Sequence, residues 1–469
     1  MFFLPKLPLS NQTVKTVDSF AGLDLRESIP DSALADCVNI SPSGFPAISV
    51  CNPWVEESTP ATLSDIFGIG SGDLIKVLDG SPMQVIWNSQ KPDGTPSAVT
   101  LYLAAGDSLA AAERFADSLV LLTKTGSGWR LCQYNSSGGK IREVDMSSFL
   151  GGTDTVIGGM LSFERRLLIL YNNSIRISFY NDLEKWDQYL IDGKLSPRAA
   201  QQHTIEEGGY FTCCINYKSH PVLLKQNALY LVQNSVAPYA FVKAADVGCI
   251  NPRSAAICNG VLYFLSPDGV MAYNGSLPKL VSADCPTFPE ELKDSGGCTQ
   301  NSCYYIGNYA YAPEKEVWTK IRNSLPERKI SAAGSYCGAV FYRSITAEGI
   351  QLYRYSPYSF DSDQTPEEWY IITKCFHENE SRQKKLTKFA FRIEPQQEVS
   401  VSVLISADGG SWQSVYEGNT ARCGAKEIVL KVPPCQDIKF KIRGTGKATI
   451  PYLRWIYRVI PDGKIHPFL

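Results

Sequence analysis

The feature that most constrains this chain is a hairpin pattern that recurs along its middle. Its clearest copy is GVLYFLSPDGVMAYNG, residues 260–275, in which two short apolar runs flank a Pro-Asp-Gly turn. Large side chains alternate from Val261 to Leu265, and a return strand follows the turn, so the segment predicts two antiparallel strands. The residues that we assign to its turns are Asp268, Gly269, Asn274 and Gly275.

Looser copies of this hairpin recur at a rough period. Strand-like openings begin near Leu119, Leu167, Leu229, Leu262, Tyr304 and Val340. The first and last of these openings are 221 residues apart in five steps, about 44 residues per step, although single steps vary from 33 to 62. A period of about 40 to 50 residues is typical of β-propeller blades with four strands each. With one more blade before residue 106, we expect six or seven blades; the alternative is a pair of β-sandwiches, whose strands would come every 8 to 12 residues.

The last hundred residues show a cleaner pattern. Phe389, Phe391 and Ile393 alternate with polar or small neighbours, and later segments keep the same period of two. Such alternation predicts an antiparallel β-sandwich with one buried and one solvated face on each strand. We therefore expect an all-β chain, a β-propeller followed by a C-terminal antiparallel β-sandwich. The expected divisions are residues 1–60, an extended N-terminal docking arm; 61–365, the propeller; and 366–469, the sandwich.

The arm is inferred from what residues 1–60 lack. They show little regular pattern, yet they contain Phe, Leu and Ile that a flexible tail would not need. We expect this segment to become ordered on another surface, such as a neighbouring subunit. The first ten residues, MFFLPKLPLS, hold an apolar run too short for a secretory core, so we expect no signal peptide and no membrane insertion.

Net charge and cysteine spacing argue against a protein that grips nucleic acid and against a disulfide-bonded or metal-binding protein. The net charge is -2, from 45 basic and 47 acidic residues, which is unlike the basic footprint of a protein that grips nucleic acid. The 14 cysteines are scattered, and strand-like runs hold Cys132, Cys258, Cys337 and Cys375. Cysteine in such runs behaves as a small buried apolar residue. Because no CxxC spacing occurs, we expect reduced thiols and no metal site.

Motifs for catalysis are missing from the sequence. The four histidines, His203, His220, His377 and His466, lie far apart, and no GxSxG, P-loop or HExxH motif occurs. A glycoside hydrolase needs only two carboxylates at a suitable distance. The candidates for such a pair are Asp361, Asp363, Glu367 and Glu368, which we interpret as a solvated cluster in a linker. We therefore expect no enzyme, no catalytic residue and no cofactor.

The segment SADGGSW, Ser406 to Trp412, nearly reproduces the Asp box of sialidase blades. It occurs once, outside the repeating region, and it is one residue short before the Trp. We interpret Asp408, Gly409 and Gly410 as an ordinary strand turn, in which the Asp bonds to its own backbone and the two glycines take positive φ.

Three segments together resemble a known group of proteins. FAGLDLRESIPDSALADCVNISPSGFPAIS (20–49) resembles the leader of virion proteins encoded by phages and prophages of Gram-positive bacteria. VGCINPRSAAICNGVLYFLSPDGVMAYNGSLPKLVS (247–282) is similar to their blade segment, and KKLTKFAFRIEPQQEVSVSVLISADGGSWQSVY (384–416) to their closing sandwich. The group is similar in architecture to the tail nozzle, or tail tubular protein B, of short-tailed phages.

This resemblance implies a structural protein of a phage particle, a subunit of the tail nozzle or head-to-tail ring that forms part of the DNA channel. The implied partners are further copies of the chain, as a hexamer or dodecamer, the portal-adjacent connector and other tail proteins. Double-stranded DNA would pass without sequence recognition, and near-neutral charge suits such sliding because each phosphate contact adds affinity. The implied location is the virion, assembled in the bacterial cytoplasm.

A second hypothesis is a propeller that binds or cleaves carbohydrate, as a reader of host receptors. It would use aromatic platforms such as Trp369 and Trp412, with Asp408 among its acids. The lack of repeated Asp boxes disfavours this alternative.

Overall fold

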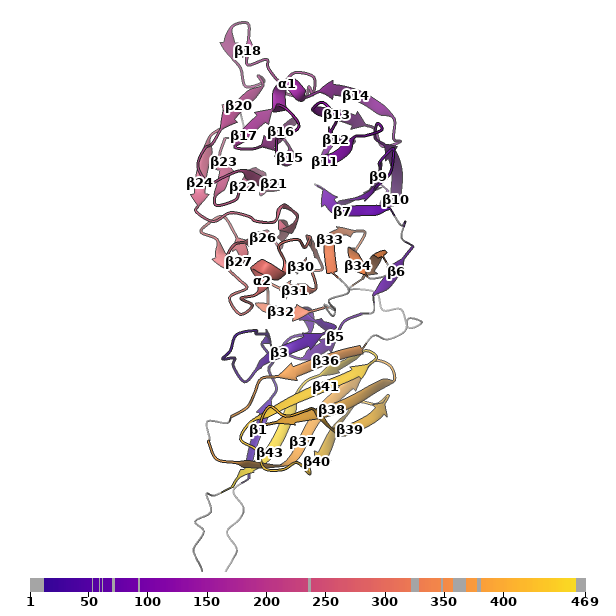
Figure 1. Cartoon of the computed structure of the whole chain (residues 1–469), viewed down its shortest axis with the longest axis vertical. Helices are drawn as coiled ribbons and strands as arrows, with labels where there is room; N and C mark the ends of the chain where they lie inside the picture. The colour runs from indigo at the N-terminus through magenta and orange to yellow at the C-terminus, as the bar shows by residue number, and fades with distance from the viewer. Residues whose placement is uncertain are drawn as a thin grey trace, which may run out of the picture. The chain divides into compact units, whose positions relative to one another are not determined.

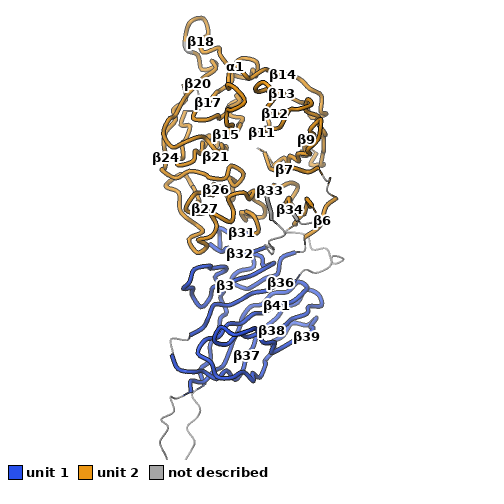
Figure 2. The backbone as a smooth tube through the Cα atoms, viewed as in Figure 1, with its two compact units in different colours: residues 1–53, 309–323, 361–469 blue, residues 54–308, 324–360 orange. Residues whose placement is uncertain are grey.

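The structure is a computed structural model of the whole chain. It describes residues 12–52, 54–58, 60, 62–69, 72–91, 93–234, 238–321, 329–346, 349–356, 368–377 and 381–460. Strands make up almost all of its regular structure, which confirms the expected all-β class. The chain divides into two compact units (Figure 2). The sandwich unit is residues 1–53, 309–323 and 361–469, and the propeller unit is residues 54–308 and 324–360.

Seven antiparallel sheets of four strands correspond to the blades (Figure 1). The first four are β7 (Leu63–Ile69), β8 (Asp73–Leu78), β9 (Gln84–Gln90) and β10 (Pro96–Tyr102); β11 (Ser108–Phe115), β12 (Ser118–Lys124), β13 (Trp129–Tyr134) and β14 (Lys140–Asp145); β15 (Ile157–Phe163), β16 (Arg166–Tyr171), β17 (Ser174–Ile177) and β20 (Gln201–Thr204); and β21 (Phe211–Tyr217), β22 (His220–Lys225), β23 (Leu229–Val232) and β24 (Phe241–Ala245). The other three are β25 (Ala256–Cys258), β26 (Val261–Ser266), β27 (Gly269–Tyr273) and β28 (Lys279–Leu280); β29 (Gly297–Gln300), β30 (Cys303–Ile306), β31 (Tyr309–Ala312) and β32 (Val317–Lys320); and β33 (Lys329–Tyr336), β34 (Ala339–Thr346), β35 (Gly349–Tyr355) and β6 (Val55–Glu57). Of the sixth sheet, β31 and β32 belong to the sandwich unit.

The seventh sheet closes the propeller with a strand from the other end of the unit. Its first three strands are consecutive, but its outer strand is β6, which pairs antiparallel with β35 and places Leu352 opposite Glu57. Among the inner strands, β33 contacts both β29 and β7, so the last blade adjoins the first. A core cluster that includes Leu63, Ile66 and Leu352 fills the space between these two sheets. The ring of blades is therefore closed by residues almost 300 positions apart.

Strands in the interior of the blades, such as β12 and β16, are buried on both faces because successive sheets pack face to face. Leu119 to Thr123 of β12 are all buried, and so is every residue of β16. Continuous apolar runs are the expected sequence of such strands. Small residues let the inner strands approach closely: a Cβ on Gly158 would lie 2.5 Å from the carbonyl oxygen of Phe211, and one on Gly334 would lie 3.1 Å from the amide nitrogen of Gly68.

Short elements connect the sheets. The helical turns are η1 (Pro42–Gly44), α1 (Ser147–Leu150), η2 (Pro252–Ser254) and α2 (Phe288–Glu291). A two-stranded hairpin, β18 (Leu190–Ile191) with β19 (Lys194–Leu195), projects from the third sheet between β17 and β20 (Figure 1). Within the described ranges, every helix is too short or too polar to cross a membrane.

Two sheets form the sandwich. One runs β1 (Thr13–Val17), β43 (Leu453–Val459), β37 (Lys384–Pro395), β42 (Ala448–Ile450), β5 (Ile48–Val50) and β4 (Ile40–Ser41), with β40 (Gly424–Val429) paired to β37. The other runs β2 (Gly22–Leu23), β3 (Ala33–Val38), β36 (Glu368–Thr373), β41 (Ile438–Thr445), β38 (Val399–Ala407) and β39 (Gln413–Thr420). The alternation predicted for β37 holds, since Phe389, Phe391 and Ile393 are fully buried. The two sheets meet at aromatic rings, with Phe389 stacked on Phe440 at 4.7 Å between centroids.

The N-terminal segment differs from the arm that the sequence predicted. Residues 12–52 form β1 to β5 and pair with strands from the C-terminal third, as in Thr13 opposite Tyr457 and Val38 opposite Tyr370. Residues 1–11 lie outside the described ranges. The sandwich unit therefore combines residues 12–53 and 309–323 with the predicted C-terminal domain, and the propeller begins at residue 54. The apolar residues of the segment have an intramolecular explanation, because Leu34, Ile40 and Ile48 are fully buried.

Candidate functional site

The predicted blade turns occupy the ends of strand β27. Ser266 and Gly269 are the last pair of the hairpin, so Pro267 and Asp268 form its turn, and the amide of Asp268 donates to the Ser266 hydroxyl at 3.2 Å. Gly269 and Gly275 both have positive φ, 135° and 108°. Asn274 accepts hydrogen bonds from the backbone and the hydroxyl of Ser276. These four residues therefore lie in the turns at the two ends of β27, and the backbone carbonyl of Asn274 also accepts a hydrogen bond from Lys218 at 3.2 Å.

The sandwich turn is built differently from the prediction. Asp408 and Gly409 take the positive φ values, 50° and 71°, whereas Gly410 closes the turn by donating its amide to the carbonyl of Ala407. The Asp408 carboxylate accepts the amides of Gln436 and Asp437, at 2.7 and 2.9 Å. The Asp408 side chain therefore binds the backbone of residues 436–437 and not, as the sequence had predicted, the backbone of its own turn.

The residues considered for sugar chemistry are scattered. Trp369 is 0% exposed and donates its indole N–H to the carbonyl of Gly446, so it is part of the core and offers no platform. Trp412 is 37% exposed. Glu368 lies at the start of β36, while Asp361, Asp363 and Glu367 lie outside the described residues.

The three histidines within the described ranges, His203, His220 and His377, lie on different segments of the fold. His203 is on β20, where burial lowers its pKa, and its ring lies 4.7 Å from that of Phe241. His220 begins β22, and His466 lies outside the described residues. His377 follows β36 and contacts Asp437, Nδ1 to Oδ1 at 2.5 Å. Only His377 has a titratable partner among these contacts.

Cysteine burial follows the prediction in part. None of the 14 cysteines forms a disulfide, and Cys132 and Cys258 are buried as expected. Cys337, however, is exposed in the turn between β33 and β34, with φ at 46°. Cys375 is half-buried, and its thiol lies near His377 and Asp437, with the three donor atoms within 4.8 Å of one another. Sequence spacing gave no sign of this group, because 60 residues separate the histidine from the aspartate.

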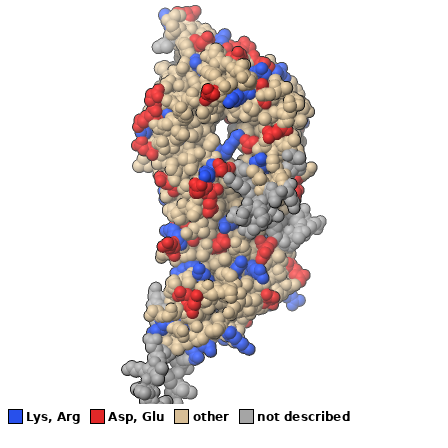
Figure 3. Space-filling model, viewed as in Figure 1, with Lys and Arg blue, Asp and Glu red and all other residues tan. Residues whose placement is uncertain are grey.

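Two charged side chains meet across the middle of the propeller unit. Arg253 of η2, next to the fifth sheet, lies 2.6 Å from Asp65 of β7 in the first sheet, Nη2 to Oδ2. Its guanidinium carbon is 3.7 Å from the ring centroid of Phe67. The sixth and seventh sheets lie between these two sheets in the ring order, so the pair joins sheets that are not neighbours in the ring. Figure 3 shows an opening near the centre of this unit.

A buried carboxyl lies on the inner strand of the second sheet. Glu113 of β11 is 8% exposed, and burial raises its pKa to about 8; the nearby Asp73 adds to this, whereas hydrogen bonds from the amides of Ser162 and Arg114 oppose it. The group is therefore largely protonated at neutral pH. Its hydrogen bonds go to backbone amides, and they join β11 to β15 of the next sheet.

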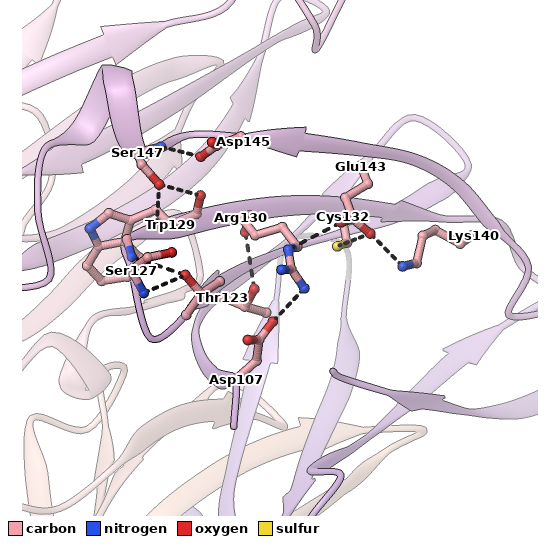
Figure 4. Close-up of polar contacts among 12 residues, drawn as sticks. Asp107, Thr123, Ser127, Trp129, Arg130, Cys132, Lys140, Glu143, Asp145 and Ser147 are labelled. Carbon is pink, nitrogen blue, oxygen red and sulfur yellow. Dashed lines mark hydrogen bonds and ion pairs between the residues drawn. The ribbon is translucent and has the colours of Figure 1, made fainter. Parts of the chain in front are cut away.

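The outer strands of the second sheet carry a network of paired charges (Figure 4). Arg130 of β13 contacts Asp107 at 3.0 Å and Glu143 of β14 at 3.3 Å, and Lys140 lies 2.6 Å from Glu143. The hydrogen bond from Lys140 lowers the pKa of Glu143. These charges neutralise one another on a solvent-facing surface, where such pairs stabilise little.

A hollow of about 410 Å³ lies beside the projecting hairpin of the third sheet. Its lining includes Tyr189, Pro197, Gln201, Gln202, His203 and Pro238. The Tyr189 hydroxyl accepts from Arg176 at 2.5 Å and donates to Gln202 at 3.4 Å. An aromatic ring, two prolines and two side-chain amides make a surface for a neutral polar ligand. The sequence contains no signal for it, because its residues come from β20 and from irregular connections at separate places in the chain.

Comparisons with known proteins give a limited answer. No family model and no curated protein matches the chain. Among solved structures, it is similar to the acylaminoacyl peptidase of Pyrococcus horikoshii, at 10% identity and a TM-score of 0.38, over 66% of this chain and 57% of that one. It is also similar to the β-propeller domain of the Trilobed protease from Pyrococcus furiosus, at 11% identity and a TM-score of 0.38, over 62% of this chain and 94% of that domain.

A third similar structure is the WD40 domain of coronin from Toxoplasma gondii, at 9% identity and a TM-score of 0.33, over 76% of this chain and 90% of that one. This chain spans little more than half the length of the peptidase. At these scores the likenesses carry no argument about activity, and the fold rests on the strands and registers described above.

Proposed function

We propose that this protein is a structural, non-enzymatic subunit of a phage particle, located in the tail nozzle or head-to-tail ring. The observation that carries the proposal is the way each unit is closed. The propeller unit is locked by β6 on β35, and the sandwich unit by β1 on β43. Strands far apart in sequence therefore hold each unit together, as a subunit that bears load in a particle requires.

The three segments that resemble phage virion proteins coincide with whole structural pieces. Residues 20–49 contain β2 to β4 and most of β5, residues 247–282 contain the complete fifth sheet, and residues 384–416 contain β37 and β38. The resemblance thus follows the fold in both units and is not confined to one turn or one strand.

The charges suit a wall past which DNA slides. The net charge is -2, and surface pairs such as Arg130 with Glu143 cancel locally. In a ring of copies, the DNA channel lies between the copies of the chain. By analogy with nozzles, six or twelve copies form the ring beside the connector, after assembly in the bacterial cytoplasm.

The test is quantitative mass spectrometry of purified, DNA-filled particles from an induced culture of the source bacterium. This chain is measured against the major capsid protein, and the unfractionated lysate serves as the control. We expect a fixed number of about 6 or 12 copies per particle. A chain that stays in the soluble lysate and is absent from particles would rule the proposal out.

The hollow beside β18 supports a second candidate, a propeller that binds carbohydrate. Its amides and the Tyr189 ring are the kinds of group that contact sugar hydroxyls and apolar sugar faces. Binding on a glycan array that Tyr189→Ala abolishes would favour it, with Tyr210→Ala, an exposed tyrosine outside the hollow, as the matched control. Signals no higher than the array background would dismiss this candidate.

A further inference from the structure

Two short segments of the sandwich bring three different donor groups to one place. Residues 375–377 follow β36, and residues 435–437 precede β41. An antiparallel bridge between Phe376 and Ile438 joins them, with the amide of Phe376 donating to the carbonyl of Ile438 at 2.8 Å. The segments are therefore held side by side by backbone bonds that do not involve the donor groups.

The core residue between the donors decides which way they point. Phe376 is 1% exposed and packs on Trp455, at 4.4 Å between ring centroids. In extended chain, neighbouring side chains point to opposite faces and residues two apart share a face. Cys375 and His377 therefore both turn away from the core, toward Asp437. The side chain of His377 is 64% exposed and that of Asp437 is 37% exposed, so the place is open to solvent.

Two hydrogen bonds with Asp408 hold the backbone of Asp437 in place. Its amide donates to the Asp408 carboxylate at 2.9 Å, and its carbonyl accepts the amide of Asp408 at 3.0 Å. The predicted sandwich turn thus holds the aspartate in position by two backbone bonds. Ligands that are held by a second set of contacts in this way are a recurrent feature of metal sites.

We propose that Cys375, His377 and Asp437 bind a transition-metal dication of the zinc class. Thiolate, imidazole and carboxylate are the ligand types that zinc takes from proteins, and three protein ligands leave a fourth position for water or for a group of another molecule. The metal charge balances the thiolate and the carboxylate. The proposal is independent of a role in phage particles, and it departs from the cysteine spacing, which predicted no metal.

The distances are close to those that an ion requires. The three donor atoms lie within 4.8 Å of one another. Tetrahedral zinc with bonds of about 2.0 to 2.3 Å places its ligand atoms roughly 3.3 to 3.8 Å apart. His377 and Asp437, whose Nδ1 and Oδ1 lie 2.5 Å apart, have to separate by roughly 1 Å, and the thiol, which lies within 4.8 Å of both donor atoms, has to approach by at most about 1.5 Å. The side chains of His377 and Asp437 are exposed, so rotation about their side-chain bonds allows this separation.

The experiment is titration of the full-length, chelator-treated protein with zinc alone, followed by titration with cobalt(II) as a spectroscopic probe. We expect one equivalent of zinc per chain and a thiolate-to-cobalt charge-transfer absorption. His377→Gln and Asp437→Asn should each weaken binding by at least about tenfold, since even indirect partners of a metal cost that much. Cys375→Ser should abolish the charge-transfer absorption.

The matched control is Cys423→Ser, which removes an exposed cysteine of the same unit outside the group. It should bind zinc with unchanged affinity. If Cys375→Ser fails to fold, the variants of the two exposed ligands decide. Zinc binding that is absent from the parent chain, or that survives unchanged in His377→Gln and Asp437→Asn, would overturn the proposal.

Discussion

The propeller and the sandwich build their sheets from different parts of the chain. In the propeller, six of the seven sheets use consecutive stretches of chain, and a single remote strand, β6, completes the seventh. In the sandwich, both sheets mix strands from the first 52 residues with strands from the last hundred. The first design relies on local pairing and the second on distant pairing. Changes to the chain should therefore affect the two units very differently, and four predictions test that contrast.

The largest effect is expected from deletion of residues 1–52. It removes five strands from the sandwich and the buried side chains of Leu34, Ile40 and Ile48. A loss of this size exceeds the whole stability of a typical domain, about 5–15 kcal/mol, so the sandwich should unfold. Hydrogen exchange should show unprotected amides in β36, β41 and β43, with the intact chain as the control. Normal protection of those strands would restore the separate arm that the sequence predicted.

Single core substitutions should cost each unit a similar amount. Phe264 in the propeller and Phe440 in the sandwich are both fully buried. Phe264→Ala and Phe440→Ala should each lower the free energy of unfolding of their own unit by about 3–5 kcal/mol. The measurement is chemical denaturation, with exchange protection read separately in each unit. Tyr102→Ala, at a side chain 61% exposed, is the control and should change stability by less than about 0.5 kcal/mol.

The stability of the propeller unit should depend on pH through the buried carboxyl of Glu113. Burial raises the pKa of Glu113 to about 8 from its usual value of 4.5, so between these two pH values the folded state holds a proton that the unfolded state has lost. Its contribution is therefore complete below pH 4.5, falls as the pH rises, and is lost above about 8. Glu113→Gln, which needs no proton, should raise the propeller's stability at pH 9 by about 2–4 kcal/mol relative to pH 5. Denaturation of both proteins at the two pH values checks this, and parallel pH profiles would contradict it.

The smallest expected effect comes from the closing strand. Replacing Val55–Glu57 with Gly-Ser-Gly weakens three register pairs, because Gly has a low preference for strands, and it removes the contact of Glu57 with Arg354. All of these lie at one edge of one sheet. Stability should fall by about 1–3 kcal/mol, and exchange protection should fall first in β35. Arg354→Gln, which removes only the partly exposed ion pair, should cost less than about 1 kcal/mol. Cooperative unfolding of all the blades would show that closure matters more than local pairing.

The same contrast explains what could be predicted from the sequence. Strands β26 and β27 could be predicted because a short turn joins two apolar runs. Strand β37 could be predicted because one of its faces is exposed to solvent, so that polar and apolar residues alternate. The strands of the N-terminal segment could not be predicted in this way, because β2 and β4 have only two residues each, too few to show a period. Their partners are more than 300 residues away, apart from short local pairs.

The candidate sites were predictable only where bonding is local. Asn274 and Gly275 form the expected turn because the bonds stay within a few residues. Asp65 and Arg253, by contrast, are 188 residues apart, and His377 and Asp437 are 60 apart. No periodicity connects such pairs, because only the closed fold brings them together.

The composition of the sandwich from both ends of the chain has a consequence for synthesis on the ribosome. Strands β1 to β5 emerge first, but their partners β36, β37, β41 and β43 emerge only after the whole propeller has been made. Roughly 300 residues at about 5–20 residues per second is a delay of about 15–60 s. During that time the leading strands remain nascent, with unpaired edges and apolar side chains that bind chaperones. The blades can form one after another as they emerge, whereas the sandwich, although it begins first, must finish last.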